Sequence, residues 1–89
     1  MSQQKGDIMR ASDRLLNLEF HRLEVWRTNK KDVCVAFQRC EVKDRAVLAS
    51  VFGEGLTFEE ACEDYLLQIS GKTLVFDAYT DKRKEVIVL

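Results

Sequence analysis

The pattern of apolar and polar positions is clearest between residues 57 and 71. Apolar side chains recur there at intervals of three and four residues, which places them on one face of an α-helix. They are Phe58, Ala61, Cys62, Tyr65, Leu66 and Ile69. Thr57 and Glu60 form the T-x-x-E pattern of a capping box, and Gly71 suits the left-handed conformation at which many helices end. The sequence therefore predicts an amphipathic helix over residues 58–69.

Four shorter apolar runs predict strands on either side of this helix. They are residues 32–37, 46–52, 73–78 and 85–89. The second run is apolar almost throughout, which is typical of a central strand, and Gly53-Glu54-Gly55 is expected to end it. Residues 41–44 are charged and suit a turn or the strand ends around it. Turn residues at 80–83 separate the last two runs, so these runs are expected to pair as a hairpin.

The first thirty residues fit two patterns. One helical face collects Met9, Leu16, Phe20 and Leu23. Ser12 or Asp7 is a suitable N-cap for such a helix. Residues 22–28 also alternate in the manner of a strand, so the pattern leaves open whether residues 20–28 are helix or strand. A helix over residues 8–20 followed by a strand over 22–28 satisfies both patterns.

Together these elements predict an α+β domain with the order α-β-β-β-α-β-β. About four to five antiparallel strands would form a sheet, covered on one face by the helix over 58–69 and by the N-terminal helix. At 89 residues the chain accommodates a single domain, 1–89. Residues 1–6 are polar and are expected to form a disordered tail.

Composition and charge narrow the class of protein. Hydrophobic residues make up 46% and charged residues 33%, as in ordinary globular proteins. There is no apolar run of ~20 residues to cross a bilayer and no apolar signal segment at the start, so the expected location is the cytoplasm. The net charge is +3 over residues 1–31, −5 over 32–70 and +1 over 71–89. This acidic middle is a poor footprint for a protein that grips a phosphate backbone.

The sequence offers little for metal, cofactor or nucleophile chemistry. Cys34, Cys40 and Cys62, with His21, lack the close paired spacing of zinc sites and of a Cys–His pair. Cys34 and Cys62 lie within apolar patterns and are expected to be buried thiols. Gly71-Lys72-Thr73 looks like the end of a phosphate-binding loop, but it follows a helix and fits a C-cap. We therefore expect that the protein binds no metal ion or cofactor and is not an enzyme.

Four carboxylates gather on the polar face and first turns of the predicted helix. They are Glu59, Glu60, Glu63 and Asp64. A solvated outer face is one interpretation of this pattern. The other is a partner-binding surface that docks on a basic protein or imitates nucleic-acid phosphates. If a partner is bound, this acidic face is the surface expected to bind it.

Basic residues at two predicted turns suggest a different surface. They are Lys30, Lys31, Lys82, Arg83 and Lys84. If both turns lay at one end of the sheet, these side chains would form a nucleic-acid-binding patch on which Trp26 could stack a base. Lysine is common in turns, so ordinary solvation also explains them. Separately, residues 86–89 are apolar on both faces, which favours self-association through the strand over 85–89 or through the N-terminal helix.

The junction between the second strand run and the helix carries a family resemblance. Gly53-Glu54-Gly55-Leu56-Thr57-Phe58-Glu59-Glu60-Ala61 resembles the G-x-T-x-E-E-A junction of HicB-like antitoxin domains. The β-β-β-α-β order of those domains is similar to that expected over residues 22–78. The resemblance implies a protein that binds and blocks a small RNA-cleaving toxin.

A broader resemblance covers residues 53–76, which look like small proteins encoded by phages and prophages of Gram-positive bacteria. Several compact proteins of that kind bind and inhibit a host enzyme, including defence nucleases. The function expected from the sequence is therefore that of a non-enzymatic phage-type accessory protein of the host cytosol, which acts by binding another protein. The alternative is a small nucleic-acid-binding regulatory module or an antitoxin-like protein.

Overall fold

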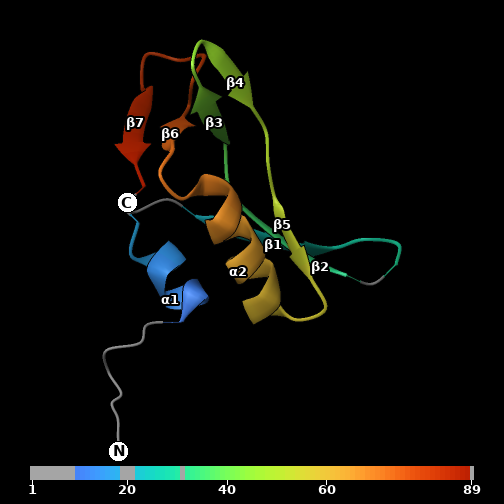
Figure 1. Cartoon of the computed structure of the whole chain (residues 1–89). Coiled ribbons are helices and arrows are strands. Elements are labelled where there is room, and N and C mark those ends of the chain that lie inside the picture. The colour runs from blue at the N-terminus through green and yellow to red at the C-terminus, as the bar shows by residue number, and fades with distance from the viewer. Residues whose placement is uncertain (1–9, 19–21, 31, 89) are drawn as a thin grey trace, which may run out of the picture.

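The computed structural model describes residues 10–18, 22–30 and 32–88. It confirms the predicted α+β class. In chain order the elements are α1 (Ala11–Leu16), β1 (Leu23–Arg27), β2 (Val33–Phe37), β3 (Cys40–Asp44), β4 (Val47–Ala49), β5 (Gly53–Gly55), α2 (Phe58–Ile69), β6 (Thr73–Phe76) and β7 (Lys84–Ile87). Figure 1 shows α1 beside α2, with α2 in front of β1, β2 and β5 and the remaining strands above the helices.

The strand pairs are antiparallel, as expected, but they form two sheets where one was predicted. The first sheet has the order β1-β2-β5 and the second has the order β4-β3-β6-β7. The chain passes from one to the other at Gln38 and Arg39, between β2 and β3. Arg39 has a φ of 51°, and the turn sends β3 to pair with β4 and β6 instead of with β2. The charged residues 41–44 form most of β3 and are a strand.

The single strand predicted over residues 46–52 is wrong. Its first half is β4 in the second sheet, whereas β5 begins only at Gly53 and pairs with β2 in the first sheet. The glycines that were expected to end a strand therefore form one. They are needed because β5 lies directly against α2: a Cβ at Gly53 would collide with the Ala61 carbonyl oxygen, and a Cβ at Gly55 with the Ala61 amide nitrogen.

The helix α2 confirms the predicted bounds of 58–69. The Thr57 hydroxyl accepts a hydrogen bond from the Glu60 amide (3.1 Å), and Glu60 Oε1 accepts one from the Leu56 amide (3.0 Å). Gly71 has a φ of +75°, as predicted for the residue that ends the helix. The apolar face is buried at Ala61, Cys62, Tyr65, Leu66 and Ile69, while Phe58 at the first turn stays partly exposed.

The N-terminal helix α1 is shorter than the predicted range of 8–20, whose two ends lie outside the described residues. Its predicted face is wrong: Leu15 is fully buried, whereas Leu16 is 58% exposed. Its N-cap is Arg10, without a side-chain hydrogen bond, because Ser12 lies within the helix and bonds to α2 instead. Among the other residues assigned to this helix, Leu23 lies in β1, and Asp7, Met9 and Phe20 are not among the described residues.

The C-terminal hairpin is confirmed, with β6 and β7 paired from Thr73 opposite Ile87 to Phe76 opposite Lys84. Beyond β7, Val88 is buried and its amide donates to the Lys72 carbonyl (2.9 Å).

The strand predicted over 22–28 is present as β1. The core lies between the helices and the facing sides of both sheets. Among the described residues neither helix is long and apolar enough to span a bilayer.

Candidate binding surface

The carboxylates on α2 are largely used for contacts within the chain. Glu59 accepts two hydrogen bonds from Ser12, one from its backbone amide (3.2 Å) and one from its hydroxyl (2.7 Å). The hydrogen bond from the Ser12 hydroxyl lowers the pKa of Glu59, so this carboxyl group is ionised at neutral pH. Glu59 therefore ties α1 to the first turn of α2.

Two more of these carboxylates fix the start of α2 against β5. Glu60 completes the capping box, and Asp64 Oδ2 accepts hydrogen bonds from the Glu54 amide (2.9 Å) and from Gln68 Nε2 (3.2 Å). Only Glu63 of the four makes no hydrogen bond to another described residue, and it is exposed. Three of the four residues predicted to bind a partner thus support the fold.

The basic residues of the two turns do not form one patch. Lys30 lies in the turn between β1 and β2, and residues 82–84 lie at the end of the hairpin of β6 and β7. Figure 1 places these turns at different extremities of the molecule. Arg83 Nη2 also lies 2.9 Å from Glu85 Oε2, so part of the charge is neutralised locally. Lys31 falls outside the described residues.

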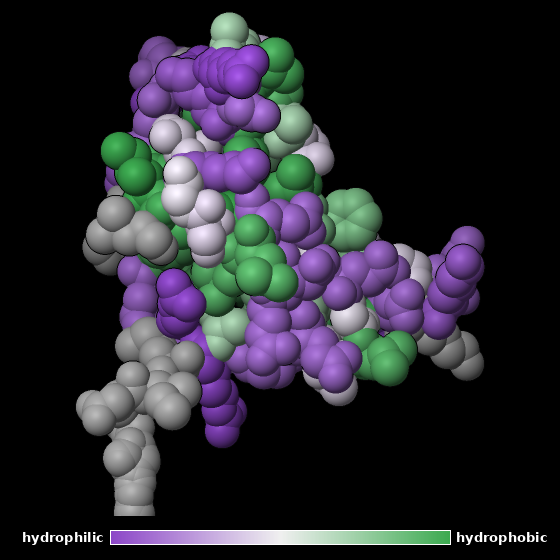
Figure 2. Space-filling view, viewed as in Figure 1, coloured by the Kyte–Doolittle hydropathy of each residue, from purple (hydrophilic) through white to green (hydrophobic). Residues whose placement is uncertain are grey.

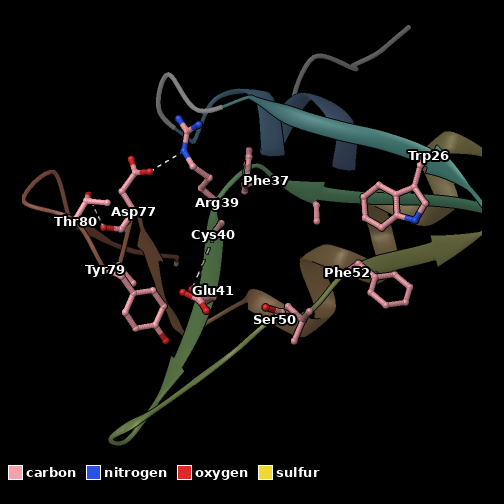
Figure 3. A pocket seen from close by; sticks show the side chains of 13 residues that line it. Trp26, Phe37, Arg39, Cys40, Glu41, Ser50, Phe52, Asp77, Tyr79 and Thr80 are labelled. Atoms are coloured by element: carbon pink, nitrogen blue, oxygen red, sulfur yellow. Dashed lines mark hydrogen bonds and ion pairs between the residues drawn. The ribbon is translucent and has the colours of Figure 1, made fainter.

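A concavity of about 540 Å³ opens on the side of the sheets that faces away from α2 (Figure 3). It lies at the junction between the first and the second sheet. Three aromatic residues around it are exposed: Trp26 by 40%, Phe52 by 46% and Tyr79 by 83%. The rest of its lining comprises Ala36, Phe37, Arg39, Cys40, Glu41, Ser50, Val51, Asp77, Ala78 and Thr80.

The strand register explains why Trp26 lies in this concavity. Val35 and Phe37 point toward α2 and belong to the core, so the alternate residue Ala36 points to the opposite side. Trp26 is paired with Cys34, two positions from Ala36, and shares that outer side. Phe52 comes from the link between β4 and β5, and its ring lies 5.9 Å from that of Trp26 at an angle of 53°.

The rim of the concavity is fixed by Arg39 and Asp77. Arg39 Nε lies 2.7 Å from Asp77 Oδ1, and the Asp77 amide donates to the Arg39 carbonyl (3.0 Å). Both residues have left-handed backbone conformations, with φ values of 51° and 52°, which are uncommon outside glycine. Non-glycine residues persist in this region where their surroundings hold them, often beside binding sites. Tyr79 follows in the same turn, which Thr80 closes through bonds to the Asp77 carbonyl.

The thiols are poorly suited to nucleophilic chemistry. Cys34 and Cys62 are buried, as predicted, and burial raises the pKa of both, that of Cys62 to about 11. Cys40 lines the concavity, where burial raises its pKa to about 12, so its nucleophilic thiolate form is scarce at neutral pH. The described residues hold no cluster of three or more His, Cys, Asp or Glu side chains arranged for a metal ion. His21 lies outside the described residues.

Sequence reasoning missed most of this surface. The alternation in residues 22–28 placed Trp26 opposite the apolar side of its strand, which is a usable signal for an exposed aromatic. Phe52 gives no such signal, because the pattern predicts it as the last residue of a central strand over 46–52, which the structure does not have. Tyr79 was not assigned a role within the predicted hairpin.

The helix-bearing side of the molecule also exposes apolar groups. Figure 2 shows them in the middle of this side, between polar groups on the upper hairpins and on the turn at the right. Leu16, Leu67 and Ile87 are exposed, and β7 is an edge strand of the second sheet. Self-association through residues 85–89 or the N-terminal helix therefore stays a prediction.

Comparison with known proteins identifies no relative from which a role could be transferred. The chain matches no protein-family model, no curated protein and no solved structure. The functional argument therefore starts from the geometry of the concavity.

Proposed function

We propose that this protein is a non-enzymatic binding module that recognises a partner protein through the concavity lined by Trp26, Phe52 and Tyr79. The observation that carries the proposal is the exposure of three aromatic side chains around one preformed apolar hollow. Exposed apolar patches of this kind mark binding sites, and tryptophan and tyrosine supply much of the binding energy in protein interfaces.

The charges of the concavity favour a protein partner over a nucleic acid. Arg39 is paired with Asp77, so its positive charge is neutralised at the rim. Glu41 adds a carboxylate to the lining and would repel phosphate groups. Aromatic stacking alone would suit single-stranded nucleic acid, but such proteins combine it with a basic groove. The aromatic groups here lie beside acidic ones.

The concavity is also a better docking surface than the acidic side of α2 that the sequence suggested. Glu59, Glu60 and Asp64 would have to exchange hydrogen bonds within the chain for bonds to a partner. The exposed aromatic side chains around the concavity would not have to give up hydrogen bonds of this kind to bind a partner. A phage-type inhibitor could act through this surface by covering a site on its target, and that part of the proposal rests on the resemblance alone.

Capture of the partner by matched variants tests the proposal. The tagged chain is exposed to a lysate of the cells that encode it, in three forms: unaltered, Trp26→Ser combined with Tyr79→Ser, and Glu63→Gln. We expect one protein to be retained by the unaltered chain and by Glu63→Gln, and at least about tenfold less of it by the double variant, because central aromatic residues dominate interface energies. Circular dichroism checks that all three forms are folded.

Two outcomes would contradict the proposal. Equal retention of the partner by the double variant would remove the concavity as the docking surface. Recovery of nucleic acid in place of protein, with binding that weakens steeply as salt rises, would establish the alternative function instead. The double variant is suitable because both aromatic side chains are substantially exposed, so their loss removes little core packing.

A further inference from the structure

We propose that the concavity accepts a positively charged side chain of the partner, with arginine the better fit, between its aromatic groups and beside the Glu41 carboxylate. The inference rests on the proposed protein-binding function and adds the chemistry that the partner must present. Three observations carry it: the charge balance of the lining, the charge of the adjoining face of the first sheet, and the placement of the aromatic rings.

The lining of the concavity has one carboxylate in excess. Its charged residues are Arg39, Glu41 and Asp77. The Nε–Oδ1 contact of 2.7 Å pairs Arg39 with Asp77 and leaves Glu41 over. Within the described part of the chain no ion pair joins Glu41 to a basic side chain, although it is only partly exposed. A partly buried carboxylate without an ion-pair partner is stabilised when a cationic group of the partner protein replaces the water around it.

The first-sheet part of the face beside the concavity has the same sign. Glu24 is paired with Ala36 and Glu54 with Cys34, so both lie on the side of the first sheet that carries Trp26. On the adjoining side of the second sheet, Glu85 lies 3.6 Å from Lys43 and 2.9 Å from Arg83, so one carboxylate there faces two cationic groups. A basic segment that approaches across the first sheet therefore meets an acidic surface before it reaches the concavity, and this favours its encounter over that of an acidic segment.

The aromatic rings complete the site for a cation. Figure 3 shows Trp26 and Phe52 on one side of Glu41 and Tyr79 on the other. Cations are attracted to the faces of aromatic rings, most strongly to that of tryptophan. A guanidinium group can stack on a ring while it donates two parallel hydrogen bonds to a carboxylate, which an ammonium group cannot do. This combination selects arginine ahead of lysine.

Trp26 is the only tryptophan of the chain, so its fluorescence reports directly on the concavity. Three end-blocked tripeptides serve as probes: leucine–arginine–leucine, leucine–glutamine–leucine and leucine–glutamate–leucine. We expect the arginine peptide to bind at least about fivefold more tightly than the glutamine peptide, and the glutamate peptide to bind most weakly. Glu41→Gln should weaken binding of the arginine peptide about tenfold and leave the glutamine peptide unaffected.

Glu63→Gln on α2 is the matched control, since it removes the same charge away from the concavity and should leave all three affinities unchanged. Equal binding of the arginine and glutamine peptides would overturn the inference, as would an arginine preference that survives Glu41→Gln. Failure of the arginine peptide to bind would overturn it too. The proposed function is judged separately, by whether the Trp26 and Tyr79 variant still retains its partner protein.

Discussion

The side chain of Tyr65 connects the helix to the first sheet at the level of single atoms. Its hydroxyl oxygen accepts a hydrogen bond from the Phe37 amide at 3.1 Å, at the last residue of β2, and both residues are buried. Burial raises the pKa of the Tyr65 hydroxyl, so it stays protonated and neutral. The ring of Tyr65 also packs against that of Phe37, with centroids 5.8 Å apart. The hydroxyl satisfies an amide that the sheet leaves unpaired where the chain turns toward β3.

Replacing Tyr65 by phenylalanine should therefore cost about 1–2 kcal/mol of unfolding free energy, because the Phe37 amide is left buried without a partner. Urea denaturation followed by circular dichroism measures the loss. Tyr79→Phe removes the same atom from an exposed ring and should leave the denaturation midpoint unchanged. Equal effects of the two substitutions would mean that the Phe37 amide finds another acceptor.

At the scale of elements, α1 is held to α2 partly by an ionised group. Ser12 donates two hydrogen bonds to Glu59, and these favour the charged carboxylate. The pKa of Glu59 is lowered by folding, so its contribution to stability is present above the unfolded-state value of about 4.3 and is lost as the pH falls through the lower folded-state value. Acid should therefore loosen α1 in particular.

Ser12→Ala tests this link between pH and α1. At pH 7 we expect the substitution to lower the free energy of unfolding by about 1 kcal/mol, which is typical of a hydrogen bond to a charged group that is partly exposed. At pH 3 the difference between the two forms should shrink, because Glu59 is then largely protonated in the unfolded chain and the hydrogen bond favours its ionised form. A difference that stays the same at both pH values would show that Ser12 acts through packing alone.

The close contact between β5 and α2 gives a second test at this scale. Gly53→Ala should destabilise the fold by about 2–3 kcal/mol, since the added methyl group meets the backbone of Ala61 and Tyr65 and neither can move without shifting α2. Gly71→Ala is the comparison: it has free space around it and meets only the strain of its positive φ, about 1 kcal/mol. Thermal denaturation of both variants ranks the two costs, and a smaller effect at Gly53 would contradict the close packing.

Local signals predicted the elements that depend on neighbours in the sequence. The helix α2 followed from its capping box and its apolar period, and the final hairpin from two apolar runs and a turn. The placement of β4 in the second sheet and of β5 in the first did not follow, because it is decided by whether β2 or β3 offers the free edge. Likewise, the sequence does not distinguish a glycine at position 53 that ends a strand from one that allows a helix to pack closely against a strand.

At the scale of the whole molecule, the candidate site arises from the arrangement of the two sheets. Trp26 belongs to β1, Phe52 to the link before β5, and Tyr79 to the turn after β6, so the aromatic groups are brought together by tertiary structure alone. The sequence could reveal Trp26 as an outward-facing residue of a strand, but not its neighbours. The acidic side of α2 was visible in the sequence because it is local, and the structure uses most of it internally.

The route of the chain between the sheets has a consequence for how the protein forms. The polypeptide leaves the first sheet after β2, builds β3 and β4 elsewhere, returns for β5, and departs again through α2 to β6. Neither sheet is a contiguous stretch, so no cut in the backbone would release one of them as an autonomous fragment. About thirty residues also separate β3 from its partner β6 along the chain. Because such distant contacts are slow to form, we expect folding to be slower than that of a simple meander and all-or-none. The hollow that we assign to binding would then exist only once the whole chain has folded.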